Sequence, residues 1–98
     1  MDARAAKARQ ERLERIVRER WGARDPEAQV TSVLRPDGKV DMTVVSRLFE
    51  GLGGLEREAL FWPTFDPVPK SDLIYMTYCL LLTPEEAARH FAAPGDSD

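Results

Sequence analysis

The feature that most constrains the fold is an uncharged run of ten residues, LIYMTYCLLL at positions 73–82. The run has almost no alternation of polar and apolar residues, and it contains isoleucine, threonine and two tyrosines. This pattern is typical of a β-strand that is covered on both faces. We therefore predict a strand over residues 73–81, as the innermost strand of a small sheet.

The segment that follows this strand has the pattern of a helix start. Thr83 can act as the N-cap, Pro84 suits the first helical position, and Glu86 completes a capping box at the third. We predict a final helix that runs to about Phe91.

The rest of the chain predicts four further elements and a hairpin turn. Apolar residues at helical spacing predict a helix from Ala3 to about Trp21, with Gly22 as its stop. Two β-rich runs flank residues 36–38 (Pro-Asp-Gly), which is a typical hairpin signal. A short helix is predicted over residues 55–62, because Pro63 should end it.

The predicted order is helix, strand, strand, helix, strand, helix. It implies a two-layer α+β domain with a three-stranded mixed sheet, in which the strands joined through a helix run parallel. We expect one domain over residues 1–92, with a basic helix at 1–24 and an α/β body at 29–92. Residues 93–98 are expected to form a flexible tail. The side chains expected to cover the sheet are Trp21, Leu60, Phe61 and Phe91.

Composition places the chain among ordinary globular proteins. It has 98 residues, 43% of them hydrophobic and 32% charged, with one cysteine and a net charge of −3. A single cysteine cannot form an internal disulfide, and no apolar run approaches the length of a membrane span. We therefore expect a cytoplasmic protein that does not enter a membrane.

Charge is distributed unevenly along the chain. Residues 1–24 contain eight Lys/Arg and four Asp/Glu, so the remainder carries a charge of −7. Such a basic arm can contact nucleic acid or an acidic partner. The alternative is a solvated helix with weak ion pairs, because acids and arginines recur four residues apart.

Three blocks of sequence resemble the BolA-like family. They are Ser46-Arg47-Leu48-Phe49-Glu50-Gly51, then Arg57 six residues after that glycine, and Ile74-Tyr75-Met76 through Leu82-Thr83-Pro84-Glu85-Glu86. The resemblance spans about residues 29–88. It implies a fold akin to the type II KH domain, with the same α-β-β-α-β-α order.

The resemblance also implies a function as a non-enzymatic adaptor in iron–sulfur homeostasis, with a monothiol glutaredoxin as partner. In the family a histidine in the last strand is implied to ligate a shared [2Fe–2S] cluster. That position is Tyr75 here, and a neutral phenol is a poor substitute for imidazole. We therefore expect no cofactor to be bound in the family's manner.

Candidate binding residues follow from these interpretations. An adaptor would bind its protein partner through the middle helix, the 63–72 loop and the outer end of the last strand; the candidates are Arg57, Trp62, Phe65, Lys70 and Tyr75. A nucleic-acid-binding regulator would use the first helix and the sheet edge; the candidates are Lys7, Arg12, Arg15 and Arg47. A third interpretation is a structural or assembly subunit.

Metal binding and catalysis have little support in the sequence. Cys79 and His90 are the only candidates for ligands of a shared cluster, and a cysteine in an apolar strand more often packs as a small hydrophobe. No motif of paired Cys or His is present, and the single histidine has no catalytic partners in the sequence. We predict that the protein is not an enzyme.

Overall fold

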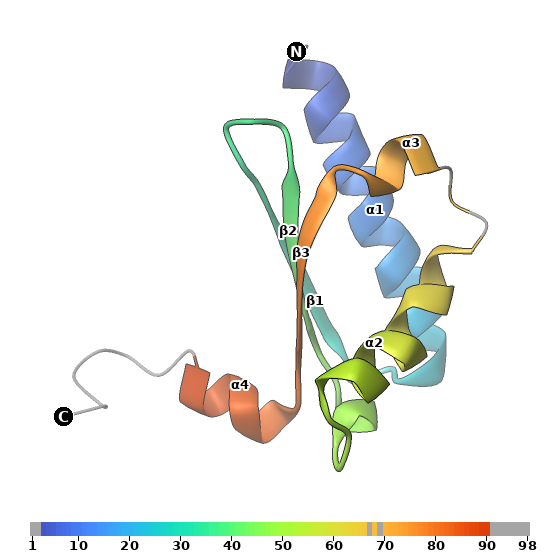
Figure 1. Ribbon diagram of the computed structural model, residues 1–98, viewed down its shortest axis with the longest axis vertical. Helices are drawn as coiled ribbons and strands as arrows, with labels where there is room; N and C mark the ends of the chain where they lie inside the picture. The colour runs from blue at the N-terminus through green and yellow to red at the C-terminus, as the bar shows by residue number, and fades with distance from the viewer. Residues whose placement is uncertain (1–2, 67, 69, 91–98) are drawn as a thin grey trace, which may run out of the picture.

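The computed structural model describes residues 3–66, 68 and 70–90 (Figure 1). Within these residues the chain forms a small α+β domain with four α-helices and a three-stranded mixed sheet, so the predicted fold class is confirmed. The elements are α1 (Ala3–Arg24), β1 (Gln29–Leu34), β2 (Val40–Val45), the 3-10 turn η1 (Arg47–Phe49), α2 (Gly54–Phe61), the 3-10 turn η2 (Trp62–Phe65), α3 (Lys70–Leu73), β3 (Met76–Leu82) and α4 (Pro84–His90).

The sheet has the order β1-β2-β3. Strands β1 and β2 pair in antiparallel fashion, and the turn between them closes with the Arg35 N–H donating to the Lys39 carbonyl at 2.8 Å. Gly38 adopts a φ of 84° in this turn, a conformation that glycine reaches without strain. Strands β2 and β3 are parallel, as expected for a connection that passes through a helix.

The structure corrects the predicted place and boundaries of the last strand. β3 is an edge strand, because the crossover through α2 returns the chain to the free side of β2. It begins at Met76 instead of Leu73, since Lys70–Leu73 forms the single helical turn α3. Its side chains are not covered on both faces, and Tyr78 is 55% exposed. The missing alternation therefore did not indicate a central strand.

Helices α1 and α2 lie on one side of the sheet, and α4 leaves the end of β3 toward the other side (Figure 1). The core forms between α1, α2 and the sheet, and its largest fully buried side chains include Trp21, Phe49 and Phe61. The Trp21 ring stacks on Phe49 with 5.1 Å between centroids. Burial of Trp21 and Phe61 is thus confirmed and Leu60 packs against this core, whereas Phe91 lies outside the described residues.

Helix α1 is longer than predicted. Gly22 does not stop it, and it continues to Arg24, where the Asp25 N–H still donates to the Trp21 carbonyl at 2.9 Å. Its first turns are anchored as well, because Ala6 and Gln10 are buried against the β-hairpin. The Gln10 amide donates to the Ser32 hydroxyl at 3.1 Å.

Candidate functional site

The face of the sheet opposite α1 and α2 is not covered by these helices, and part of it is exposed. Alternation along the strands sends the core side chains one way and a second set the other way. Val33 is 63% exposed on this second face, its neighbour Asp41 on β2 is half-buried, and Tyr78 beyond Asp41 on β3 is 55% exposed. We call this surface the open face; its residues are Thr31, Val33, Asp41, Thr43, Val45, Tyr78, Leu80 and Leu82.

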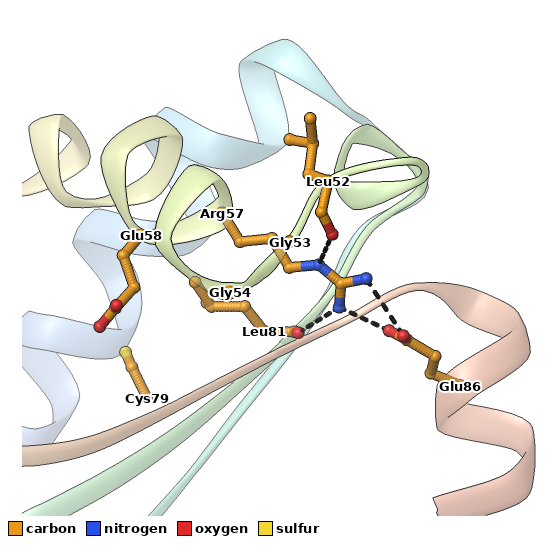
Figure 2. A pocket seen from close by; sticks show the side chains of 8 residues that line it. All are labelled: Leu52, Gly53, Gly54, Arg57, Glu58, Cys79, Leu81 and Glu86. Carbon is orange, nitrogen blue, oxygen red and sulfur yellow. Dashed lines mark hydrogen bonds and ion pairs between the residues drawn. The ribbon is translucent and has the colours of Figure 1, made fainter.

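A hollow of about 400 Å³ lies beside β3, between the start of α2 and the start of α4 (Figure 2). Its lining residues are Leu52, Gly53, Gly54, Arg57, Glu58, Cys79, Leu81 and Glu86. Arg57 reaches from α2 across one end of the hollow, and Glu58 and Cys79 lie at the other end (Figure 2). The hollow thus brings α2, β3 and α4 together.

All three nitrogens of the Arg57 guanidinium donate hydrogen bonds within the chain. Its Nε donates to the Leu52 carbonyl at 2.9 Å, and Nη1 donates to the Leu81 carbonyl at 2.9 Å. Nη1 and Nη2 also form a two-pronged contact with the Glu86 carboxylate, at 2.6 and 3.1 Å. Bidentate pairs of this kind fix orientation as well as distance. Arg57 therefore sets the position of α4 relative to α2 and β3.

Glu86 joins this contact to the predicted capping box. Its Oε1 accepts from the Thr83 N–H at 2.9 Å, and its own N–H donates to the Thr83 hydroxyl at 3.2 Å, so the predicted helix start is confirmed. Hydrogen bonds from Arg57 and then from the Thr83 backbone lower the pKa of Glu86 to about 2. The carboxylate therefore stays ionised throughout the physiological range.

This lowered pKa predicts a specific loss of stability in acid. Because the folded-state pKa of Glu86 lies below its ordinary value of 4.5, its contribution is complete above pH 4.5 and is lost as the pH falls toward 2. We expect the Glu86→Gln variant to lose this part of the pH dependence. Urea unfolding between pH 6 and 2 measures it.

The neighbouring Glu85 provides the matched control for this experiment. Its carboxylate pairs only with the exposed Arg89 at 2.8 Å, among the contacts that the described residues make. Glu85→Gln should therefore keep the acid-dependent step of the native protein. An identical pH profile for the native protein and Glu86→Gln would contradict the role assigned to Glu86.

The residues that could ligate a shared cluster lie in unsuitable surroundings. The Arg9 guanidinium covers the Tyr75 ring at 3.7 Å from its centre, so this side chain is already engaged within the chain. Burial, with a smaller contribution from Glu58, raises the pKa of Cys79 to about 12, which disfavours the thiolate that binds iron. His90 is exposed at the end of α4. These donors do not fit an iron–sulfur cluster.

Tyr75 and Cys79 are four residues apart, but they do not lie on one face of the same strand. Tyr75 precedes β3, and the register between β2 and β3 shifts between Val40 and Asp41. Tyr75 packs under α1 through Arg9, whereas Cys79 lies beside α2 in the hollow. Among the described residues, no group of three or more His, Cys, Asp or Glu side chains could hold a metal ion.

The five residues predicted to bind a protein partner do not form one surface. Phe65 is 2% exposed and packs edge-on against Phe61, so it is a core residue and its prediction as a contact residue is wrong. Trp62 is 38% exposed on η2, and Lys70 is exposed on α3. Tyr75 is half-buried under Arg9. The Arg57 guanidinium already bonds to Glu86 within the chain. Its binding to a partner protein stays a prediction from the resemblance.

The basic candidates are spread over the molecule. Lys7, Arg12 and Arg15 lie on α1, where Arg12 pairs with Asp72 of α3 at 3.2 Å. Arg15 is exposed, and glutamates lie four residues before and four residues after it, at Glu11 and Glu19. Arg47 lies on η1 beside Asp25, past the C-terminal end of α1 and roughly 25 Å along the helix axis from Lys7. These residues do not form a continuous basic stripe.

Two features of the site were not predicted from the sequence. The first is the open face, because the alternation of β2 alone could not show which strands would flank it. The second is Asp25, which is 1% exposed and accepts a hydrogen bond from the Ser46 hydroxyl at 2.7 Å. In the sequence, Asp25 precedes Pro26 and is typical of a linker. Only the fold shows that Asp25 is buried against Ser46.

Comparison with protein-family models, with curated proteins and with solved structures finds no match for this chain. None of the helices in the described part of the chain is long and apolar enough to cross a membrane. The function therefore has to be inferred from the surfaces and contacts above.

Proposed function

We propose that the protein is a non-enzymatic adaptor that binds a protein partner through its open face. The observation that supports this most is the exposure of Val33 and Tyr78 on one side of a sheet whose other side holds the core. Exposed apolar side chains on one face of a small domain commonly mark an interaction site. A tyrosine that is apolar along its ring and polar at its tip is a favoured contact residue at such sites.

The arrangement of charge supports a protein partner over a nucleic acid. The one charged side chain among the residues of the open face is Asp41 of β2, and a single arginine, Arg35, lies beside it at 3.8 Å. Binding to a phosphate backbone depends on several basic side chains placed together. Lys7, Arg12 and Arg15 lie on α1, on the other side of the sheet from the open face, so we do not extend the proposal to nucleic acid.

The resemblance to BolA-like proteins makes a monothiol glutaredoxin the first partner to test. In this proposal the complex forms by apolar contact and does not require a cluster held by Tyr75 or Cys79. The cluster chemistry of the family is left out of the proposal, because Cys79 lies in surroundings that oppose a thiolate.

Charge substitution on the open face provides the test. We expect Val33→Lys and Tyr78→Lys each to weaken partner binding by tenfold or more, because a desolvated charge opposes an apolar contact. Leu55→Lys is the matched control, since Leu55 is 84% exposed on α2, on the other side of the sheet. Binding to purified monothiol glutaredoxin, and to proteins captured from the native cell, would be measured for all three variants.

The controls decide the interpretation. Circular dichroism and urea unfolding should show that the three variants keep the native fold, because all three side chains are exposed. Equal capture by native protein, Val33→Lys and Tyr78→Lys would contradict the proposed surface. Loss of binding only with Leu55→Lys would move the surface to α2.

A further inference from the structure

The two edges of the sheet differ in how their backbone groups are satisfied. At the β1 edge, side chains of α1 bond to the outward-facing carbonyls. The Arg18 guanidinium donates to the Val30 carbonyl at 2.9 Å, and the Gln10 amide donates to the Ser32 carbonyl at 3.3 Å. Covering an edge in this way prevents it from pairing with another strand.

The β3 edge is covered much less. The Leu82 carbonyl accepts from the Ser46 N–H, so Leu82 faces β2, and alternation turns the backbone of Leu81 and Cys79 outward. The Arg57 contact to the Leu81 carbonyl agrees with this direction. Among the described residues, no hydrogen-bond partner is seen for the outward N–H and C=O of Cys79 or for the outward N–H of Leu81.

Strand β3 also lacks the usual protection of a free edge. Residues 76–82 contain no charged residue and no proline, which are the features that ordinarily block edge pairing. The hollow of about 400 Å³ lies along this edge (Figure 2). Gly53 and Gly54, which have no side chains to obstruct the space, form part of its wall. An additional strand needs room about 4.8 Å from its neighbour.

The charge beside the hollow favours one of two possible partners for the β3 edge. These partners are a second copy of this chain and a basic extended segment of another protein. Glu58 lies next to Cys79 and is exposed, whereas Glu86 is neutralised by Arg57. In a two-fold dimer built on antiparallel β3 strands, equivalent residues meet near the axis, so pairing near Cys79 would bring the two Glu58 carboxylates together. Like charges placed opposite one another are unfavourable. A basic extended segment has no such penalty.

We propose that the outer edge of β3 binds an extended peptide segment of a partner protein that carries a lysine or arginine next to apolar residues. The segment adds to the sheet as a fourth strand. One of its residues accepts from the Cys79 N–H and donates to the Cys79 C=O, and its basic side chain lies beside Glu58. This site is distinct from the open face and does not depend on the function proposed above.

The test uses a seven-residue peptide of alternating valine and threonine with a lysine at each end. Nitrogen-15 NMR of the whole chain would follow the backbone amides during titration with this peptide to about 1 mM. We expect the Cys79 and Leu81 amides to shift in a saturable manner and to exchange more slowly with solvent. N-methylation of the central peptide residues should weaken binding at least tenfold, because it removes the donors that pair with β3.

Charge variants test the role of Glu58 and distinguish this edge from the open face. Glu58→Lys should weaken binding about threefold or more, whereas Glu11→Lys, an exposed acid on α1, should leave it unchanged. Val33→Lys on the open face should also leave peptide binding unchanged, so failure of one proposal does not imply failure of the other.

Three outcomes would overturn the inference. They are absence of any shift at Cys79 and Leu81 throughout the titration, equal binding of the N-methylated peptide, and protection of these amides in a dimer of the free protein. Sedimentation equilibrium of the free protein distinguishes the last of these.

Discussion

Replacing Trp21 with alanine is expected to lower the free energy of unfolding by about 3–5 kcal/mol, the usual cost of removing a large aromatic side chain from a core. Trp21 is fully buried between α1, η1 and α2, with centroid distances of 5.1 Å to Phe49 and 5.7 Å to Phe61. Alanine would leave a cavity where three elements meet. Urea unfolding monitored by far-ultraviolet circular dichroism measures the change.

The second tryptophan is the matched control. Trp62 is 38% exposed on η2, so Trp62→Ala should cost much less than Trp21→Ala. Trp21→Phe keeps most of the ring contacts and should retain a cooperative transition even if Trp21→Ala does not fold. Equal destabilisation by the two alanine variants would contradict the assigned core.

Removal of the buried carboxylate of Asp25 is expected to cost about 2–3 kcal/mol. Its Oδ2 accepts from the buried Ser46 hydroxyl at 2.7 Å, and its Oδ1 accepts from the Glu27 N–H at 3.2 Å. Arg47 lies 3.8 Å from the same carboxylate. Asp25→Ala leaves the Ser46 hydroxyl with one fewer partner in a site closed to water, which makes the loss large.

Asp66 and an isosteric substitution provide the comparisons. The Asp66 side chain is exposed on the loop after η2, so Asp66→Ala should change stability by less than about 0.5 kcal/mol. Asp25→Asn keeps an acceptor for Ser46 and should lie between the native protein and Asp25→Ala. The assignment would fail if Asp25→Ala were as stable as Asp66→Ala in chemical unfolding.

The order of elements could be predicted from the sequence because several of the boundaries have a local signal. The turn at residues 36–38 and the capping box of Thr83 and Glu86 depend on residues close together in the chain. The short helix α3 was missed, since its single turn at Lys70–Leu73 leaves no periodic pattern. Gly22 was misinterpreted as a stop because the packing of Trp21 holds the helix past it.

The place of β3 in the sheet could not be predicted in the same way. A run of apolar residues shows that a strand avoids water in part, but not on which side its neighbour lies. The crossover through α2 decides this, and it places β3 at the edge. Tyr78 is exposed because its side chain lies on the open face, which neither α1 nor α2 covers.

The candidate site was predictable only in its parts. The sequence indicated Arg57 and Cys79 as residues of interest, and the structure brings both to one hollow. It could not show that Glu86 would occupy the Arg57 guanidinium, because the two residues are 29 positions apart. Phe65 was misplaced for a similar reason, since its burial depends on Phe61 and Trp62 around it.

Hydrogen exchange of the β3 amides tests most directly the claim that this strand is a free edge with its outer backbone open. We expect the Leu80 and Leu82 amides, which face β2, to exchange at least about tenfold more slowly than those of Cys79 and Leu81 in the free monomer. Equal protection of all four amides would mean that a further strand covers the outer side of β3, and it would contradict the account.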